Sequence, residues 1–203
     1  MIKRLKQGDI IRKVEYIYSA TVEDNILNVR KIIFPLVIVL TQDCDLESYT
    51  GRIVDVPPSA KAGLLLSVLV APVYNADHLR SGVHLSELKI AVDRIVSDEW
   101  TKIRKNENKR YHYFIFPSDL HLIPEAVVDF KHYFSVPVNY LQAIREKGHI
   151  CTLPPLYRES FSQRFAAFLS RIALPERHPP LKLFQDMKDE SIAVDNPGRS
   201  VDN

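Results

Sequence analysis

The alternation of apolar and polar positions predicts strands in the first half of the chain. Ile10 to Ser19 alternates in this way, and Val22 to Val29 is expected to be its hairpin partner, with an interruption at Asp24-Asn25. Ile32 to Leu40 and Gly63 to Tyr74 are almost continuously apolar, which is the pattern of strands buried on both faces. The N-terminal part is therefore expected to supply the strands of a β-rich core.

The middle of the chain combines helical and strand patterns. Apolar residues at steps of three and four predict an amphipathic helix over about 84–104. Arg110 to Phe116 changes to a period of two, which predicts a strand, and Ala126 to Val136 is expected to add one or two more. Val138 to Glu146 is expected to be a short helix or turn.

Pro154-Pro155 begins the clearest helical pattern, since a proline in the first turn removes an N–H that had no partner there. This helix is expected over about 155–173. Its apolar stripe is Tyr157, Phe161, Phe165, Phe168, Leu169 and Ile172. Beyond it prolines and charges increase, so 176–203 is expected to be a flexible tail and 1–175 a single domain.

Composition and charge exclude several classes of protein. The chain has 203 residues, 46% of them apolar and 26% charged, which is ordinary for one globular domain with a core. The net charge of +2 gives no global reason to bind nucleic acid or a membrane, so such binding must come from local patches. No apolar segment is long enough to span a bilayer and no secretory signal is present, so we expect a cytoplasmic protein without membrane contact.

The sequence has no cofactor or metal motif. Six glycines, without a GxGxxG or GxxxxGK[ST] pattern, exclude a glycine-rich phosphate loop. The histidines show no paired spacing typical of metal ligands, and the two cysteines, Cys44 and Cys151, are expected to be free thiols. We therefore expect no cofactor and no metal site.

The segment Thr41-Gln42-Asp43-Cys44-Asp45 follows a predicted buried strand, where a rigid scaffold commonly presents side chains to ligands. The flanking carboxylates disfavour a thiolate at Cys44 unless a histidine or arginine offsets them. Three interpretations are open. The segment is a turn whose carboxylates cap backbone amides, a rim that binds a ligand or partner through Gln42, Asp43 and Asp45, or a catalytic site that uses Thr41 and Cys44.

A cationic segment follows the predicted central helix. Its candidate nucleic-acid-binding residues are Lys102, Arg104, Lys105, Lys109, Arg110 and Tyr111, with Trp100 and Tyr113 at its ends. Cations bind phosphates and rings stack on unpaired bases, so this segment is the best local candidate for nucleic-acid contact. The alternative is a solvated helix end, where the helix dipole favours cations. Arg110 and His112 are expected on one face of their strand, beside the same pocket.

The C-terminal helix also carries arginines next to its apolar stripe. Arg164 and Arg171 are seven residues apart and share a face, and Arg158 precedes them. A docked helix with salt bridges is one interpretation. Contact with an acidic partner or an RNA backbone is the other.

Three short segments resemble the PemK/MazF-type plasmid-toxin barrels. They are Gly8-Asp9-Ile10, then Phe34 to Thr41 (FPLVIVLT), then Leu66 to Val73 (LSVLVAPV), in the order in which that family carries GD, RPxVVLS and a VxVxPxT-like strand. The resemblance covers roughly the first 75 residues and implies an SH3-like barrel. In that family many members are metal-independent endoribonucleases, paired with an antitoxin that occupies the RNA groove.

The resemblance also assigns roles to single residues. Thr41 matches the Ser/Thr that closes the family's central strand, whereas Phe34 stands where the family has an arginine. That arginine would stabilise the charge that develops on the phosphate, so Arg30 or Arg110 would have to replace it, with His112 as proton shuttle. The segments beyond this pattern look similar to a set of bacterial proteins with a (S/T)QxCD-type signature.

Together these patterns predict an α+β fold: a small SH3-like β-barrel core with a helical insertion at about 84–104 and a C-terminal amphipathic helix. We expect a non-catalytic binding module of a bacterial toxin–antitoxin or defence-type system. Its partner would be nucleic acid, RNA rather than DNA, or another protein, and a homodimer is compatible with this. The alternatives are a metal-independent endoribonuclease of the PemK/MazF type and a thiol-dependent enzyme that uses Cys44 with His112.

Overall fold

The structure is a computed structural model, and it describes residues 4–47, 65–115 and 123–171. Met1–Ser170 form one unit and Arg171–Asn203 a second. The expected tail, 176–203, the last residues of the expected C-terminal helix and the first two of the expected strand at 63–74 lie outside the described residues. Within the described ranges, no helix is both long and apolar enough to cross a membrane.

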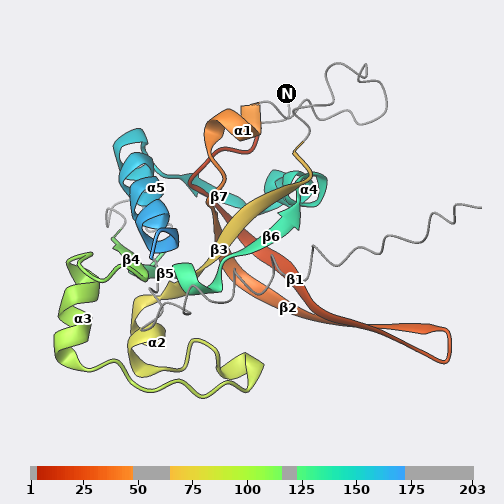
Figure 1. Cartoon of the computed structure of the whole chain (residues 1–203), viewed down its shortest axis with the longest axis horizontal. Coiled ribbons are helices and arrows are strands. Elements are labelled where there is room, and N and C mark those ends of the chain that lie inside the picture. Colours follow the sequence, from red (N-terminus) through yellow and green to blue (C-terminus); the bar gives the residue numbers. More distant parts are fainter. Residues whose placement is uncertain (1–3, 48–64, 116–122, 172–203) are drawn as a thin grey trace, which may run out of the picture. The chain divides into compact units, whose positions relative to one another are not determined.

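The fold is mixed α+β and centres on a seven-stranded antiparallel sheet (Figure 1). Its strands are β1 (Asp9–Glu23), β2 (Ile26–Val39), β3 (Ser67–Asn75), β4 (Tyr111–Phe114), β5 (Ala126–Asp129), β6 (Phe134–Pro137) and β7 (His149–Thr152). Their order is β4-β5-β3-β2-β1-β7, and β6 pairs with β3 beside this path. The terminal strands β4 and β7 do not pair with each other, so the sheet is open where the sequence predicted a closed barrel. β7 was not predicted.

The alternation predicted a hairpin here, but both strands are longer and Val22 belongs to β1, because the turn lies at Asp24-Asn25 and not before Val22. Its two loop residues, Asp24 and Asn25, have φ of +50° and +59°, the left-handed conformation that Asp and Asn tolerate in a two-residue hairpin turn. β2 runs unbroken, so the segments 22–29 and 32–40 are not separate elements. The prediction that 32–40 is buried throughout is wrong for its first residues, since Ile33 is 49% exposed.

Five α-helices and two 3₁₀ turns accompany the sheet among the described residues. They are α1 (Asp43–Glu47), α2 (Ala76–Ser81), η2 (Ser86–Leu88), α3 (Ser97–Arg104), η3 (Phe130–His132), α4 (Val138–Gly148) and α5 (Pro155–Leu169). The predictions of a helix after residue 138 and of a helix that begins at the paired prolines are confirmed.

The predicted helix over 84–104 is wrong in its first half. η2 ends at Lys89, whose φ is +57°, and the chain is not helical again until α3. Gly82 shows why. A Cβ at Gly82 would lie 2.1 Å from the carbonyl oxygen of Val92, so the returning backbone passes directly over this residue. The apolar residues of this irregular segment therefore make separate contacts and do not form one face of a helix.

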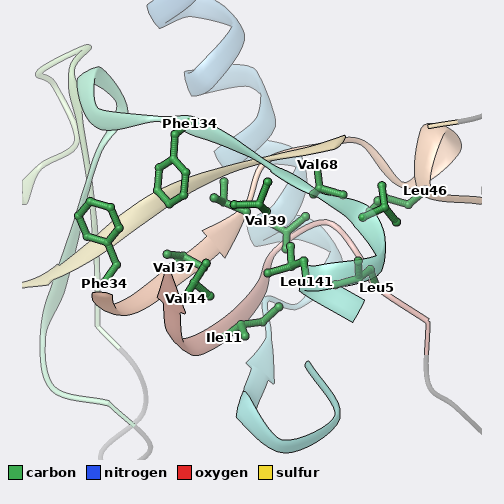
Figure 2. Close-up of a cluster of buried hydrophobic side chains, with 13 residues drawn as sticks. Leu5, Ile11, Val14, Phe34, Val37, Val39, Leu46, Val68, Phe134 and Leu141 are labelled. Atoms are coloured by element: carbon green, nitrogen blue, oxygen red, sulfur yellow. The ribbon is translucent and has the colours of Figure 1, made fainter. Parts of the chain in front are cut away.

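The core has three clusters of buried side chains, each covered by different helices. The first lies between β1, β2, β3, β6 and α4, and Figure 2 shows Leu141 of α4 gathered with Ile11 and Val39. The second packs Phe161, Phe165 and Phe168 of α5 against β1, β2, β3 and β5. The third joins α2 and α3 to β3, β4 and β5. Each helix therefore fixes a different part of the sheet.

The Gly8-Asp9 pair has a structural use at the start of β1. Gly8 takes the left-handed conformation, with φ of +78°, which favours glycine. The Asp9 carboxylate is fully buried and accepts hydrogen bonds from the Lys6 amide at 3.0 Å and from Arg145 Nε at 2.6 Å. The Thr152 hydroxyl also donates to it. This network joins β1 to α4 and β7. The Gly8-Asp9 motif, which contributes to the family resemblance, therefore has a structural role.

Candidate nucleic-acid interface

The loop between α3 and β4, residues 105–110, accepts hydrogen bonds from an arginine of α5. Arg164 donates from Nη2 to the carbonyl oxygens of Asn108 and Tyr111, at 2.7 Å each, and from Nη1 to the carbonyl oxygen of Asn106. These contacts join residues more than 50 positions apart in the sequence. Two loop carbonyls and that of Tyr111, the first residue of β4, would otherwise need water and are satisfied by one guanidinium group, which fixes the path of the loop.

Two asparagines complete the support of this loop. The Asn106 side chain donates to the Tyr113 carbonyl and accepts from the Tyr113 amide, at 2.8 Å in both directions, as a strand partner would. Asn106 has φ of +58°, which turns the chain out of α3. Asn108 accepts from the Arg110 amide at 2.8 Å and donates to the Glu99 carboxylate. Side chains of α3, of α5 and of the loop itself therefore fix the conformation of the loop.

Four exposed cations lie on this loop and on the end of α3. Lys102, Lys105 and Lys109 are exposed, and none of them forms an ion pair with another described residue. Arg104 is also exposed, and its guanidinium lies 5.8 Å from the centre of the Tyr113 ring. Glu107 is the one carboxylate within the loop. We name these four cations (Lys102, Arg104, Lys105 and Lys109) the cationic platform.

The aromatic residues at the ends of the cationic segment, 100–113, pack against other side chains of the protein. Trp100 and Tyr113 are 8% and 6% exposed and meet edge to face, with ring centres 6.0 Å apart. Tyr111 lies under the guanidinium of Arg110, at 4.8 Å. None of the three rings presents an open face for a base, so the stacking part of the predicted interface has no support in the geometry.

Arg110 is committed to an internal ion pair. Its Nε and Nη2 donate to the two oxygens of Asp129 at 2.8 and 2.5 Å, and Asp129 is fully buried. The hydrogen bond to Asp129 raises the pKa of Arg110 above its ordinary value, so the guanidinium stays charged. Arg110 therefore neutralises a buried carboxylate, and a phosphate would have to displace that carboxylate to bind it.

His112 lies on the opposite face of the β4–β5 ladder from this ion pair. Its cross-strand partner Val128 belongs to the cluster under α5, whereas Tyr111 pairs with Asp129 on the other face. The His112 ring packs edge-on against Phe161 at 5.1 Å and is 7% exposed. Burial, assisted by the charge of Arg164, lowers its pKa to about 3. The predicted pairing of Arg110 with His112 beside one pocket is not observed.

The Thr41–Asp45 segment ties the start of the chain to β3 and α5. The Thr41 hydroxyl accepts from the Leu69 amide at 2.7 Å. The Asp43 carboxylate accepts from the Gln7 amide at 2.7 Å and from Nη1 of Arg158, near the first turn of α5. Two of its residues therefore serve local structure, as the interpretation of a turn that caps backbone amides requires.

The remaining side chains of this segment are exposed. These are Gln42, Cys44 and Asp45, and the Cys44 sulfur lies 3.6 Å from Gln42 Oε1. Arg158 and Arg164 are six residues apart on α5, about 9 Å along its axis. Since Arg158 binds Asp43 and Arg164 holds the loop 105–110, the two predicted sites lie near different parts of one helix. Both arginines are used internally, as the interpretation of a docked helix expects.

A cluster of ionisable side chains that sequence reasoning missed surrounds Tyr74. Its hydroxyl lies 3.1 Å from Nδ1 of His132, which is 3.4 Å from Asp129 Oδ2, and the His84 ring meets the Tyr74 ring at 4.8 Å. Burial raises the pKa of Tyr74 and lowers the pKa values of both histidines. Two mainly apolar cavities of about 390 and 290 Å³ share Tyr74 in their lining. These residues lie in separate segments without a shared motif, so no sequence signal could have joined them.

No group of three or more metal-ligating side chains occurs within the described ranges. The chain matches no family model, and it has no significant match among curated proteins.

Proposed function

We propose that this protein is a non-catalytic binding module whose cationic platform binds the phosphate backbone of a nucleic acid. The observation that carries the proposal is the Arg164 contact to the carbonyls of Asn106, Asn108 and Tyr111, because it fixes the backbone that carries Lys105 and Lys109 without using their charges. A preformed cationic surface loses little conformational entropy when it binds a polyanion. The family resemblance adds the setting of a toxin–antitoxin or defence-type system, and we propose the open sheet as a variant of an SH3-like barrel.

The geometry favours recognition of phosphates over recognition of bases. The nearby rings are covered by other residues, and the exposed side chains are lysines and one arginine, which bind phosphates as point charges or by a planar fork. Binding should therefore depend strongly on salt and weakly on sequence. RNA remains the preferred ligand in the proposal because the resembled family acts on RNA.

The two enzymatic alternatives have less support. An endoribonuclease needs a group that exchanges protons near neutral pH, and a histidine with a pKa of about 3 is neutral there. Of the two arginines offered as replacements for the family's missing arginine, Arg110 is bound to Asp129, and Arg30 lies in the β1–β2 hairpin, whereas His112 lies in the β4–β5 ladder. For a thiol enzyme, Cys44 is exposed on α1, whereas its proposed partner His112 is buried against Phe161, and burial, with the charge of Asp9, raises the pKa of Cys151 to about 11.

The charge of the platform should control nucleic-acid affinity. We expect the triple variant Lys102→Gln, Lys105→Gln, Lys109→Gln to bind more weakly and to lower the slope of log K against log salt by roughly 2–3, because each phosphate contact contributes about 0.9. The measurement is a fluorescence-anisotropy titration at several salt concentrations with single-stranded RNA, double-stranded RNA and double-stranded DNA. The three ligands decide which polyanion is preferred.

A matched control has the same net charge. Lys6, Lys89 and Lys147 are exposed lysines outside the platform, and their triple glutamine variant should keep nearly all of the affinity. Equal losses in both triple variants would mean that total charge and not the platform attracts the ligand. If the folded wild-type protein binds none of the three nucleic acids, the proposal is wrong and a protein partner takes its place.

The thiol of Cys44 should be dispensable. We expect Cys44→Ser to change the free energy of unfolding by less than about 0.5 kcal/mol and to leave nucleic-acid affinity unchanged, because the side chain is exposed on α1. Urea denaturation and the same anisotropy titration measure both quantities. RNA should also stay intact when incubated with the wild-type protein in a metal chelator, and cleavage that Cys44→Ser or His112→Leu abolishes would restore an enzymatic alternative.

A further inference from the structure

The smaller of the two cavities beside Tyr74, of about 290 Å³, is lined by two groups of aromatic rings. In the first group, the rings of Tyr16, Phe34 and Phe134 meet with centres 4.8 to 6.4 Å apart, and Figure 2 shows Phe34 and Phe134 together at one end of the first core cluster. In the second group, the Tyr74 ring meets the His132 ring edge to face at 6.0 Å. A molecule inside this cavity, which we name the ring cavity, therefore touches rings of both groups.

The size and the walls of the ring cavity suit a small aromatic ligand. Its lining is mainly apolar, and Leu85 and Leu88, from the segment around η2, add to the rings. An apolar cavity of about 150 Å³ takes up one benzene molecule. A cavity of about 290 Å³ therefore has room for two fused rings or for one ring with a substituent. Ligand sites commonly combine such apolar walls with a few polar groups that orient the ligand.

His132 lines the ring cavity and has a free hydrogen-bond donor. Its Nδ1 lies 3.1 Å from the Tyr74 hydroxyl and 3.4 Å from Asp129 Oδ2, and that oxygen already accepts from Arg110. Burial lowers the pKa of His132, so its ring is neutral at neutral pH and has one N–H. Because Nδ1 accepts from the nearer Tyr74 hydroxyl, the proton is on Nε2. This atom has no hydrogen-bond partner among the described residues and is not enclosed by them, so a ligand can reach it.

The ring cavity has a positive charge. Lys131 is the one described lining residue that is charged at neutral pH, and it is exposed and forms no ion pair with another described residue. The neighbouring cavity of about 390 Å³ differs, because its described lining has the carboxylate of Glu87 and neither lysine nor arginine. An anionic group is therefore favoured in the ring cavity and disfavoured in its neighbour.

We propose that the ring cavity binds a small aromatic carboxylate. The ring of the ligand contacts the two groups of aromatic side chains, and its carboxylate accepts from Nε2 of His132 and pairs with the ammonium group of Lys131. Both residues lie in η3, and Asp129 fixes the start of this turn by accepting from the Lys131 amide at 2.9 Å. The site is independent of the cationic platform, because none of the four platform residues lines the ring cavity.

Two probes of equal size separate the charge of the ligand from its rings. We expect 1-naphthoate to bind with a dissociation constant below about 1 mM, the range expected for a ligand of this size. 1-Naphthamide has the same rings without the charge and should bind roughly 10-fold more weakly, because a hydrogen bond to a charged group is stronger than one to a neutral group. Isothermal titration calorimetry with the full chain measures both constants.

Matched lysine variants test the role of Lys131. Lys131→Gln should weaken the binding of 1-naphthoate roughly 10-fold and leave that of 1-naphthamide unchanged, because it removes only a charge. Lys147→Gln, at an exposed site on α4 outside the lining of the ring cavity, should change neither constant. The proposal is overturned if the folded wild-type protein does not bind 1-naphthoate at about 5 mM, or if the two variants lose equal affinity.

Methyl NMR spectra locate the bound probe. The methyl signals of Leu85 and Leu88 should shift when 1-naphthoate is added, because both side chains line the ring cavity. The signals of Val22 and Leu27, which are exposed apolar residues near the tip of the β1–β2 hairpin, should not shift. Shifts at the hairpin tip without shifts at the cavity would mean that the probe binds exposed apolar surface, and the proposal is then wrong. None of these measurements uses nucleic acid, so their outcome is separate from that of the platform experiments.

Discussion

Replacing Arg110 with alanine should destabilise the protein by about 3 kcal/mol, because it leaves a fully buried carboxylate without its charge partner. Asp129 would keep the Lys131 amide at 2.9 Å but lose both hydrogen bonds from the guanidinium. The Arg110 side chain is 33% exposed and also covers Tyr111, so packing adds to the loss. Urea denaturation at neutral pH measures the change in the free energy of unfolding.

A double-mutant cycle separates the ion pair from other effects. Adding Asp129→Asn to Arg110→Ala removes the uncompensated charge, so the double variant should be more stable than Arg110→Ala alone. Lys109→Ala removes a neighbouring exposed cation and should change stability by less than about 0.5 kcal/mol. If Arg110→Ala unfolds like the wild type but loses nucleic-acid affinity, Arg110 belongs to the interface after all.

The sequence predicted those elements whose pattern is local. A hairpin in the first 40 residues follows from the alternation, although its turn at Asp24-Asn25 was predicted as an interruption of the second strand, and α5 follows from an apolar stripe behind two prolines. The helix over 84–104 failed because helical spacing of apolar residues is also compatible with an irregular chain that passes over Gly82. β7 was missed because its four residues, all partly buried, are too few to show a period.

The candidate site could be predicted only in its exposed part. The lysines at 102, 105 and 109 are cationic and exposed without any distant partner. Their closeness in the sequence was therefore enough to predict a cationic surface. The roles of Arg110, Arg158 and Arg164 depend on Asp129, Asp43 and the loop carbonyls, from 19 to 115 residues away. A single sequence does not show which distant carboxylate or carbonyl an arginine will bind. It therefore does not distinguish an arginine that is bound inside the protein from one that is exposed.

The stability of the protein should fall with falling pH because of His112. In the folded state its pKa is about 3, whereas an unfolded histidine titrates near 6.5, so between these values the unfolded chain binds a proton that the folded chain does not. Stability therefore rises with pH through this window and is fully present above about 6.5. The slope approaches about 1.4 kcal/mol per pH unit, which predicts a loss of roughly 2–3 kcal/mol between pH 7 and pH 4.5.

The variant His112→Leu should remove this part of the pH dependence. Leucine fills a similar volume among Phe114, Phe130 and Phe161 and has no proton to bind in the unfolded state. Urea denaturation of both proteins at pH 7 and 4.5 should show a smaller acid loss for the variant, while His78→Gln, at an exposed site on α2, should behave like the wild type. The half-buried histidines His84 and His132 are present in all three proteins, so their contribution cancels in the comparison. Equal acid losses in the wild type and His112→Leu would mean that the His112 ring can be protonated in the folded protein, and a proton-transfer role for it would again be available.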